Sequence, residues 1–310
     1  MQRIQYHRYG GPGEMRLEQV DVPVPGPGQV RVRTKAAGAN PADWTIRSGR
    51  LRLVSGHRFP RGLGHDFAGV VDAVGPQVST HRVGDEVFGI RGIREAGAFC
   101  EYLVVDQEKA FPKPSTLSFE LAAALPMPGV TAWSAVHDKA QLRAGQSVFI
   151  TGCLGGVGRA ASQLALMRGA EVAGNCSAAT RDEALALGLG EVTDYRGFDP
   201  TTHRGRFDAV LDTATSLTMS QCAAMLKPGG GVAVHVAPYK LPACLIRRRH
   251  KVAAGRPTPD HMAGITDAAR QGRLIPKIGR TVPFADAIEA LTELETTGRP
   301  QGRLVITFAA

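Results

Sequence analysis

Gly152, Gly155 and Gly158 recur at three-residue spacing, and their pattern indicates chemistry more directly than any other in the sequence. In a turn between a strand and a helix, such glycines let the backbone approach the diphosphate of a dinucleotide, and the helix N-terminus offers it free N–H groups. A glycine triplet also occurs in ordinary packing turns, so the flanking residues have to distinguish the two cases.

The flanking residues favour the dinucleotide interpretation. Ser147 to Thr151 form a short apolar run that predicts a strand, and from Val157 onward apolar residues recur at helical spacing. In this setting the first glycine permits the tight turn, the second lets the backbone reach the diphosphate, and the third lets the helix pack on the strand. The sequence therefore predicts a dinucleotide site at 147–158.

The next predicted strand, 170–174, indicates which dinucleotide is bound. An NAD site usually carries an acid about 20 residues beyond the last glycine. Here the strand runs into Asn175-Cys176-Ser177 without an acid, and Arg181 follows; Asp182 and Glu183 are interpreted as acids of the next helix's first turn. A charge-assisted hydrogen bond of roughly 1.5–3 kcal/mol lets one arginine give about ten- to hundredfold preference for NADP. The alternative is that Arg181 is an ordinary surface arginine.

The first 115 residues are predicted to form a β-rich, barrel-like domain, because short alternating or apolar runs are separated there by glycine and proline turns. The predicted strands are 20–24, 29–37, 70–74, 86–88 and 101–105.

Beyond Pro112-Lys113-Pro114 the pattern changes to strands that alternate with helices, which predicts crossover units and a doubly wound α/β domain with a parallel sheet. Its expected helices are 118–125, capped by Ser118, 130–139 and 261–272, and its expected strands are 147–151, 170–174, 192–194, 208–212 and 231–236. A final helix at 285–296 and strand at 302–308 are expected to return to the first domain. The predicted domains are thus 1–117, completed by 274–310, and 118–273.

Composition fits a soluble globular protein, with 43% hydrophobic and 21% charged residues among 310. No apolar run reaches membrane-spanning length and the N-terminus has no signal-peptide core, so we expect a cytoplasmic location and no membrane partner. The five cysteines are scattered and odd in number, which indicates buried fillers rather than disulfides or a Cys-x-x-Cys metal site. They are Cys100, Cys153, Cys176, Cys222 and Cys244.

The net charge of +9 raises the question of nucleic acid. The one dense basic run, Arg247-Arg248-Arg249-His250-Lys251, has no aromatic residues interleaved with it. A solvated basic face is therefore favoured over a nucleic-acid site, and we expect no nucleic-acid partner. Part of the positive charge suits an anionic cofactor.

Five stretches together resemble the zinc-independent quinone oxidoreductase branch of the medium-chain dehydrogenase/reductase superfamily, the zeta-crystallin-like proteins. These stretches are 36–43, 64–71, 125–133, 148–158 and 302–305. The resemblance covers essentially the whole chain. It implies a GroES-like β-barrel catalytic domain and a Rossmann domain, with NADPH in the cleft between them. Relatives are often dimers, so a homodimer is expected.

The resemblance also implies where the cofactor is held. It places the diphosphate at Leu154, Gly155, Gly156 and Val157, between Gly152 and Gly158. Ser177 and Arg181 fall where the family holds the 2′-phosphate, and Tyr195 matches a tyrosine that often joins them.

Further cofactor contacts are implied at three other places. Thr131 matches a threonine that approaches the cofactor. His235, Val236 and Ala237 are expected near the nicotinamide. Arg303 stands where the family often has lysine.

The resemblance also implies that no metal takes part. Zinc-dependent relatives use a Gly-His-acid segment, here around His65, as a ligand, and a catalytic zinc needs about three protein ligands. The expected cysteine ligand is absent near Asn40 to Asp43, and the four cysteines of a structural zinc lobe are absent between Arg91 and Cys100. His65 is therefore interpreted as a structural or pocket residue.

Without a metal, the acceptor should already be electrophilic, such as a quinone or an α,β-unsaturated ketone, and polar groups must meet the charge that develops on its oxygen. Asn40 is the leading candidate, although it could instead hold the turn before Pro41. Asp43 is a weaker candidate, because as an acid it would need a raised pKa. Thr45 is another; it stands where several relatives have a tyrosine. The proton could also come from solvent.

Two other functions remain open at this point. One is an enoyl reductase of the same fold that acts on a polyketide or other pathway intermediate. The other is a non-catalytic protein that binds NADPH and turns nothing over. The sequence alone does not identify the substrate, since specificity lies in loops.

Overall fold

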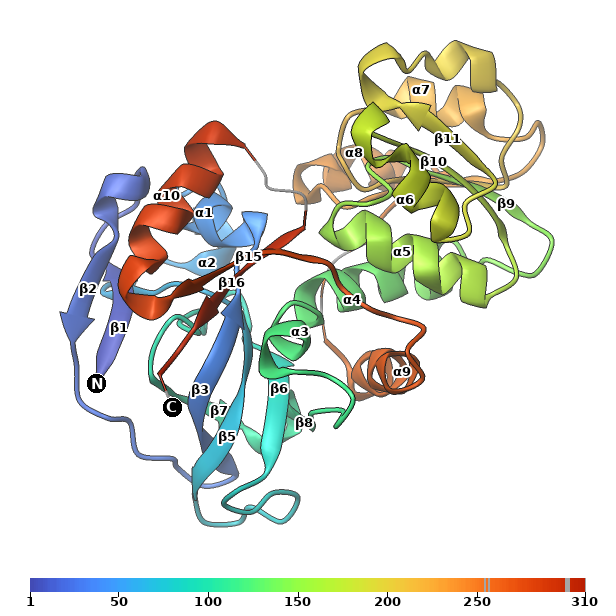
Figure 1. Ribbon diagram of the computed structural model, residues 1–310. Helices are drawn as coiled ribbons and strands as arrows, with labels where there is room; N and C mark the ends of the chain where they lie inside the picture. The colour runs from blue at the N-terminus through green and yellow to red at the C-terminus, as the bar shows by residue number, and fades with distance from the viewer. Residues whose placement is uncertain (254, 256, 299–301, 310) are drawn as a thin grey trace. The chain divides into compact units, whose positions relative to one another are not determined.

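A computed structural model describes residues 1–253, 255, 257–298 and 302–309 (Figure 1). The chain divides into two compact units, which are described separately. The first comprises Met1–Met127, Pro257–Arg270 and Ile275–Ala310, and the second comprises Pro128–Arg256 and Gln271–Leu274. This division assigns two segments, 118–127 and 257–270, to the first unit, whereas the sequence-based boundaries assign them to the second.

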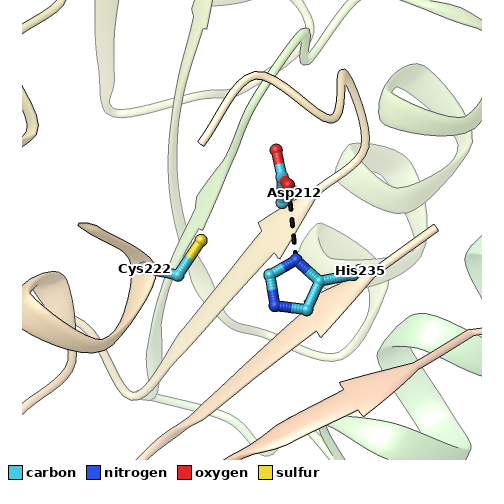
Figure 2. A group of neighbouring side chains, drawn as sticks. All are labelled: Asp212, Cys222 and His235. Carbon is cyan, nitrogen blue, oxygen red and sulfur yellow. Dashed lines mark hydrogen bonds and ion pairs between the residues drawn. The ribbon is translucent and has the colours of Figure 1, made fainter. Parts of the chain in front are cut away.

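The second unit is built on a parallel six-stranded sheet in the order β11-β10-β9-β12-β13-β14. The five strands predicted from the sequence are all present. The strands are β9 (Ser147–Ile150), β10 (Glu171–Cys176), β11 (Glu191–Asp194), β12 (Ala209–Asp212), β13 (Val232–His235) and β14 (His250–Val252). The order reverses direction between β9 and β12, so their carboxyl ends form the switch point at which such sheets bind ligands. Asp212 and His235 mark the ends of β12 and β13 there (Figure 2).

Helices cover this sheet through apolar faces. Helix α5 packs on β9 and β10, and α7 packs on β12 and β13. The helices of this unit are α4 (Pro126–Trp133), which continues into a π-helical segment (Ser134–Lys139), α5 (Gly156–Met167), α6 (Arg181–Ala186), α7 (Met219–Met225) and α8 (Leu241–Ile246). The predicted alternation of strands and helices is thus confirmed.

The first unit is built on a seven-stranded sheet in the order β15-β16-β3-β5-β6-β8, with β7 also paired to β3. Its strands are β3 (Gln29–Gly38), β5 (Asp66–Val74), β6 (Glu86–Ile90), β7 (Tyr102–Asp106), β8 (Ala110–Pro112), β15 (Ile278–Pro283) and β16 (Arg303–Thr307). Strand β16 pairs antiparallel with β3, which confirms that the tail returns to the first domain. Figure 1 shows this terminal strand beside β3.

A smaller sheet, β2-β1-β4, completes the first unit. Its strands are β1 (Gln2–Tyr6), β2 (Arg16–Gln19) and β4 (Arg61–Gly62). The prediction of a strand at 20–24 was wrong: pairing with β1 ends at Gln19, and the following segment alternates prolines, which have no N–H to donate to a ladder.

The helices of the first unit include one whose start the sequence identified. Ser118 caps α3 through a hydrogen bond that its side chain accepts from the N–H of Leu121. Helix α3 packs on β3 and β5, which explains why it groups with the first unit. The helices are α1 (Pro41–Arg47), α2 (Arg52–Ser55), α3 (Phe119–Ala123), α9 (Pro259–Arg270) and α10 (Ala287–Thr297).

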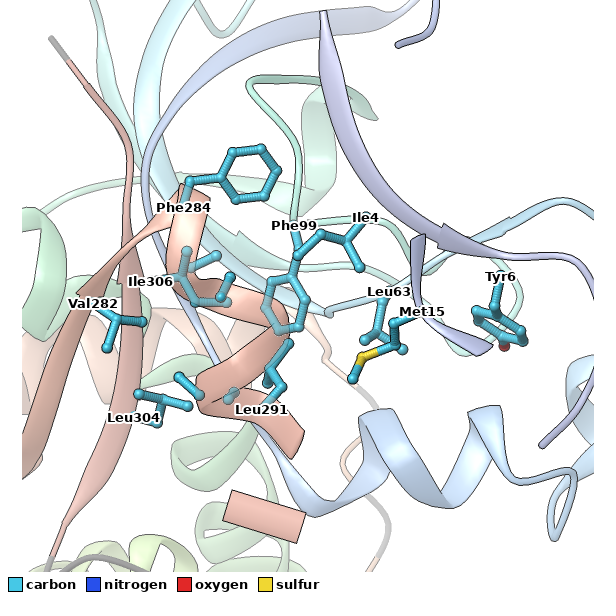
Figure 3. Packing of buried hydrophobic residues seen from close by; sticks show 14 residues of the cluster. Ile4, Tyr6, Met15, Leu63, Phe99, Val282, Phe284, Leu291, Leu304 and Ile306 are labelled. Atoms are coloured by element: carbon cyan, nitrogen blue, oxygen red, sulfur yellow. The ribbon is translucent and has the colours of Figure 1, made fainter. Parts of the chain in front are cut away.

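A buried apolar cluster joins the two ends of the chain in the first unit (Figure 3). Ile4 and Phe99 from the N-terminal part pack with Leu291 of α10 and with Leu304 and Ile306 of β16. Fully burying one such side chain is worth about 1.5–3 kcal/mol, so this cluster anchors the C-terminal segment to the β-rich unit.

The five cysteines are all buried and none of them forms a disulfide, as predicted for fillers. Among the described residues, no helix combines the length and the hydropathy needed to cross a bilayer.

Candidate active site

The glycine turn after β9 has the geometry that its glycines require. Gly152 has a φ of +59°, a left-handed conformation that favours glycine, and its N–H donates to Asn175 Oδ1 at 2.8 Å. A Cβ on Gly158 would lie 2.0 Å from the carbonyl oxygen of Gly152. Only a glycine at position 158 therefore lets α5 approach the turn this closely.

The N-terminus of α5 is available to an anion. Its N-cap residue is Gly155, so no side chain caps the helix from that position. The first turn of the helix also carries no acidic residue. Gly155 and Gly156 are exposed, while Leu154 and Val157 are half-buried. A helix end with unsatisfied N–H groups and a positive dipole suits a diphosphate.

The carboxyl ends of β10 and β11 meet beside this turn. Cys176 and Asp194 are partners in the two strands, so Ser177 and Tyr195, which follow them, are neighbours at the sheet edge. Ser177 Oγ is hydrogen-bonded to Thr180 Oγ1 at 2.9 Å. Tyr195 is 52% exposed.

Arg181 begins α6 at the same corner. It is exposed and, among the described residues, takes part in no ion pair or side-chain hydrogen bond. Glu183 forms an ion pair with Arg159, with 2.8 Å between Oε1 and the guanidinium nitrogen. Asp194 accepts a hydrogen bond from the backbone N–H of Arg196. The corner thus offers a free guanidinium, whereas two of its nearby carboxylates already have partners.

Asp212, at the end of β12, is the centre of a buried polar network that includes His235 (Figure 2). Its Oδ1 accepts from Thr151 Oγ1 at 3.1 Å, and its Oδ2 accepts from Lys240 Nζ at 2.8 Å. Burial opposes ionisation, but the hydrogen bonds from His235 and Lys240 outweigh it and hold the pKa of Asp212 below its usual value. The network ties the segment after β13 to the sheet edge.

The side chain of His235 belongs entirely to this network. It is fully buried, with Nδ1 3.3 Å from Asp212 Oδ2 and Nε2 3.0 Å from His250 Nδ1. Burial, and then the neighbouring His235, lower the pKa of His250 to about 4. Val236 is half-buried and Ala237 is buried. Both ring nitrogens of His235 are thus engaged inside the protein.

The donor set of Asp212, Cys222 and His235 does not fit a metal ion, although their potential ligand atoms lie within 4.8 Å of one another. The Lys240 ammonium already occupies Asp212 Oδ2. Burial raises the pKa of the Cys222 thiol to about 12, which disfavours the thiolate that a metal needs.

In the first unit, Asn40 is the N-cap of α1 and sits in a buried network. Its backbone N–H donates to Asp43 Oδ2 at 2.7 Å, which completes a capping box. Its amide Nδ2 donates to Asp66 Oδ2 at 3.0 Å and to Gly38 O at 3.2 Å, and its Oδ1 accepts from Arg303 at 2.7 Å. Asn40 thus holds the turn, which is the alternative that the sequence left open.

Asp66 is the carboxylate with which both Asn40 and Arg303 interact in this network. Its Oδ1 accepts from the backbone N–H of Met127 at 3.0 Å, and Arg303 lies 3.4 Å from its Oδ2. Burial raises its pKa to about 7, with Arg303 and then Asn40 opposing the rise. Asp66 was not among the site residues predicted from the sequence, although its position between His65 and an apolar strand was an available signal.

Three more predicted residues are placed by the structure. His65 is buried, and its Nδ1 lies 2.7 Å from Asp43 Oδ1. Thr45 lies on α1 and donates its hydroxyl to Pro41 O at 2.7 Å. Thr131 is buried on α4 in the second unit.

The surroundings of His65 do not fit a catalytic zinc. Asn40 supplies an amide where a thiolate would be needed, and among the described residues His65 belongs to no group of three or more His, Cys, Asp or Glu with converging ligand atoms. A tetrahedral site with three protein ligands therefore cannot be assembled from these donors.

Comparison with known proteins agrees with this architecture. Residues 26–115 match the family described as the alcohol dehydrogenase GroES-like domain, and residues 187–306 match the family described as zinc-binding dehydrogenase. A chloroplastic quinone-oxidoreductase homolog of Spinacia oleracea is 34% identical over 75% of this chain and 74% of its own.

Two further similarities span nearly the whole chain. A 2-methylene-furan-3-one reductase of Solanum lycopersicum is 30% identical over 99% of this chain and 79% of its own. The solved structure of the quinone oxidoreductase from Coxiella burnetii covers 99% of both chains, with 28% identity and a TM-score of 0.87. The chain therefore belongs to the quinone oxidoreductase branch of the medium-chain dehydrogenase/reductase superfamily and is a nicotinamide-dependent oxidoreductase.

Proposed function

We propose that this protein uses NADPH to reduce a quinone or an α,β-unsaturated ketone by hydride transfer, without a metal ion. The observation that carries the NADPH assignment is the corner formed by Ser177 and Arg181. Its guanidinium is exposed, and among the described residues it has no carboxylate partner. A 2′-phosphate would supply that partner.

The second unit supplies the groups that would hold the cofactor. The N–H groups at Gly156 and Val157 would bind the diphosphate, since the N–H of Gly155 already donates to Gly152 O at 2.8 Å. Ser177, Arg181 and Tyr195 would bind the 2′-phosphate. The backbone of Val236 and Ala237 would border the nicotinamide, with Thr131 as a further contact. When bound, the reduced nicotinamide supplies a hydride.

The class of acceptor follows from the polar groups available. The donors near His65 and near Asp212 do not fit a metal, so no Lewis acid would activate a plain ketone. A quinone or an enone is electrophilic without such help. The names of the spinach and Coxiella relatives support a quinone. The full-length similarity to the tomato reductase supports an enone as the second candidate.

The test compares acceptors and cofactors in one assay. Purified protein is mixed with NADPH or NADH and with a simple benzoquinone, a methyl vinyl ketone or an enoyl thioester, and nicotinamide absorbance is followed. We expect turnover with NADPH and a quinone or an enone. Faster turnover with the thioester, or none with any acceptor, would contradict the proposal.

The variant Arg181→Ala tests the corner directly. It should weaken NADPH binding about ten- to hundredfold, because one charge-assisted hydrogen bond is lost, and leave NADH binding unchanged. Arg143→Ala, at another exposed arginine of the same unit, is the matched control and should change neither.

We also propose that the protein is a homodimer. Leu245 and Ile246 of α8 are 80% and 84% exposed, and β14 is an edge strand of the parallel sheet. Exposed apolar side chains next to a sheet edge are typical of an interface. Light scattering of the purified protein should give twice the mass of the chain; a monomer mass would refute this.

A further inference from the structure

Two of the five buried cysteines lie together at the glycine turn of the second unit. Cys153 directly follows Gly152 after β9, and Cys176 ends β10, one residue before Ser177. Cys153 is fully buried, whereas Cys176 is 6% exposed. Neither thiol takes part in the proposed hydride transfer, although both stand next to residues that would hold the cofactor.

The backbone brings the two cysteines within reach of a disulfide. The N–H of Cys153 donates to the carbonyl oxygen of Asn175 at 3.0 Å, and Cys176 is the next residue in the chain. With standard bond lengths and a trans peptide bond, this hydrogen bond limits the distance between the two Cα atoms to about 7 Å. Disulfides join Cα atoms that are roughly 4.4–6.8 Å apart.

The two side chains also lie on one face of the sheet. A Cβ on Gly174 would lie 2.8 Å from Cys153 Cβ and 3.2 Å from Cys153 Sγ, so the Cys153 side chain covers Gly174. Gly174 and Cys176 are two residues apart in β10, and residues at this spacing share a face of a strand. Burial, and then the thiol of Cys176, raise the pKa of Cys153. The two thiols are therefore immediate neighbours.

We propose that Cys153 and Cys176 form a disulfide when the protein meets a hydroperoxide, and that this bond weakens NADPH binding. The effect on NADPH rests on the proposed function. Forming the bond draws the segment that begins at Cys153 toward the end of β10. That segment leads to the N–H groups of Gly156 and Val157, and Cys176 adjoins Ser177, so both parts of the nucleotide site are displaced.

The reaction balances with the hydroperoxide as the oxidant. Cys176, the more exposed of the two, attacks the peroxide as its thiolate; the O–O bond breaks, an alcohol leaves and a sulfenic acid forms. Cys153 then attacks this sulfur as its thiolate, the S–S bond forms, and the departing hydroxide takes up the proton of Cys153 as water. Two thiols have lost two electrons and two protons. Because burial disfavours the thiolate of Cys153, we expect oxidation over minutes to hours.

The first experiment maps the bond. Reduced protein is treated with hydrogen peroxide, the remaining thiols are alkylated, and tryptic peptides are analysed by mass spectrometry without reduction. We expect two of the five thiols to be lost and a linked pair of peptides that contain Cys153 and Cys176. Cys244→Ser, which removes another buried cysteine of the same unit, is the control and should form the same link. Absence of the link in the wild type overturns the proposal.

The second experiment measures what the bond does to the site. Fluorescence titration should show at least tenfold weaker NADPH binding after oxidation, and dithiothreitol should restore the affinity. Cys153→Ala and Cys176→Ala cannot form the bond, so each should keep after peroxide the affinity that it had before. If one variant melts early, the other still tests the bond. The same loss of affinity in both oxidised variants would show that the disulfide is not its cause.

Reciprocity gives a readout that a purely structural disulfide would not move. If the bond weakens nucleotide binding tenfold, the nucleotide must favour the reduced pair by the same factor. Saturating NADP⁺ should therefore raise the midpoint potential of the pair in glutathione buffers by about 30 mV, which is a tenfold change for a two-electron couple. An unchanged midpoint contradicts the coupling between the bond and the site.

The outcomes separate the two proposals. If the reduced wild type binds neither NADPH nor NADH, the proposed function fails, and the linked peptides still decide whether the disulfide forms. If the reduced protein binds NADPH but peroxide gives no link between Cys153 and Cys176, this inference is refuted and the proposed function stands.

Discussion

Replacing Gly158 with alanine should damage the cofactor turn through a single added methyl group. The new Cβ would lie 2.0 Å from the carbonyl oxygen of Gly152 and 3.0 Å from Thr213 Oγ1. Ordinary carbon–oxygen contacts are longer than 3 Å, so α5 and the turn would have to separate by about 1 Å. Overpacking of this kind costs about 1–3 kcal/mol, partly offset by the better helix propensity of alanine, worth up to about 1 kcal/mol.

The same displacement should weaken NADPH binding. The N–H groups at the start of α5 must point at the diphosphate within hydrogen-bond distance, and each hydrogen bond to a charged group is worth about 1.5–3 kcal/mol. Losing one or two of them corresponds to a loss of affinity of about 10²-fold or more.

The assay pairs thermal unfolding with NADPH titration. Gly158→Ala should melt several degrees lower and bind NADPH about 10²-fold more weakly. Gly230→Ala is the control: it lies in the same unit, a Cβ there meets nothing within 4 Å, and both quantities should match the wild type. Wild-type affinity in Gly158→Ala would refute the role assigned to this turn.

Three further predictions concern the buried networks. Burial raises the pKa of Asp66 from 3.8 to about 7, so between these pH values the folded protein keeps a proton that the unfolded chain has released. The stability that this proton provides is fully present below about pH 4 and is lost as the pH rises to about 7. The urea-unfolding free energy of the wild type should therefore fall over this range relative to Asp66→Asn, by up to about 4 kcal/mol; a rise would contradict the assignment. Asn40→Ala removes a cap and leaves Arg303 and Asp66 without their shared partner, so unfolding free energy should drop by about 2–4 kcal/mol, and turnover should drop more than NADPH affinity. Lys240→Met leaves the Asp212 carboxylate buried without its cation and should cost about 3–5 kcal/mol by the same measurement, whereas an unchanged value would show that the pair is dispensable.

Much of the fold could be predicted because it is encoded locally. The strands of the parallel sheet are short apolar runs, and the cap of α3 is a serine directly before an apolar helix, as Ser118 shows. Strand β14 was missed because His250 to Val252 lie inside the basic run and carry no strand pattern. In the segment 20–24 valines alternate as they do in a strand, but the prolines in and after it have no N–H to donate to a neighbouring strand.

The basic run illustrates how position decides the role of a charge. Arg247 and Arg248 are exposed, as a solvated face requires. Arg249 instead donates to the carbonyl of Lys227 at 3.0 Å, and His250 is buried against His235. The sequence could not distinguish these neighbours, because all are basic and adjacent.

The buried networks were harder to predict, because their partners are far apart in the chain. Arg303 and Asp66 are 237 residues apart, and Lys240 reaches Asp212 across 28. No local pattern signals such pairs; only the folded sheets bring them together. The available clues were two acids beside apolar strands, Asp212 at the end of one and Asp66 at the start of another.

The relative affinity for NADPH and NADH tests the central claim most directly. Both dissociation constants are measured by fluorescence titration on the same preparation, at the same ionic strength. The free guanidinium of Arg181 and the absence of an acid at the end of β10 predict at least tenfold tighter binding of NADPH. Equal affinities, or tighter binding of NADH, would contradict the account.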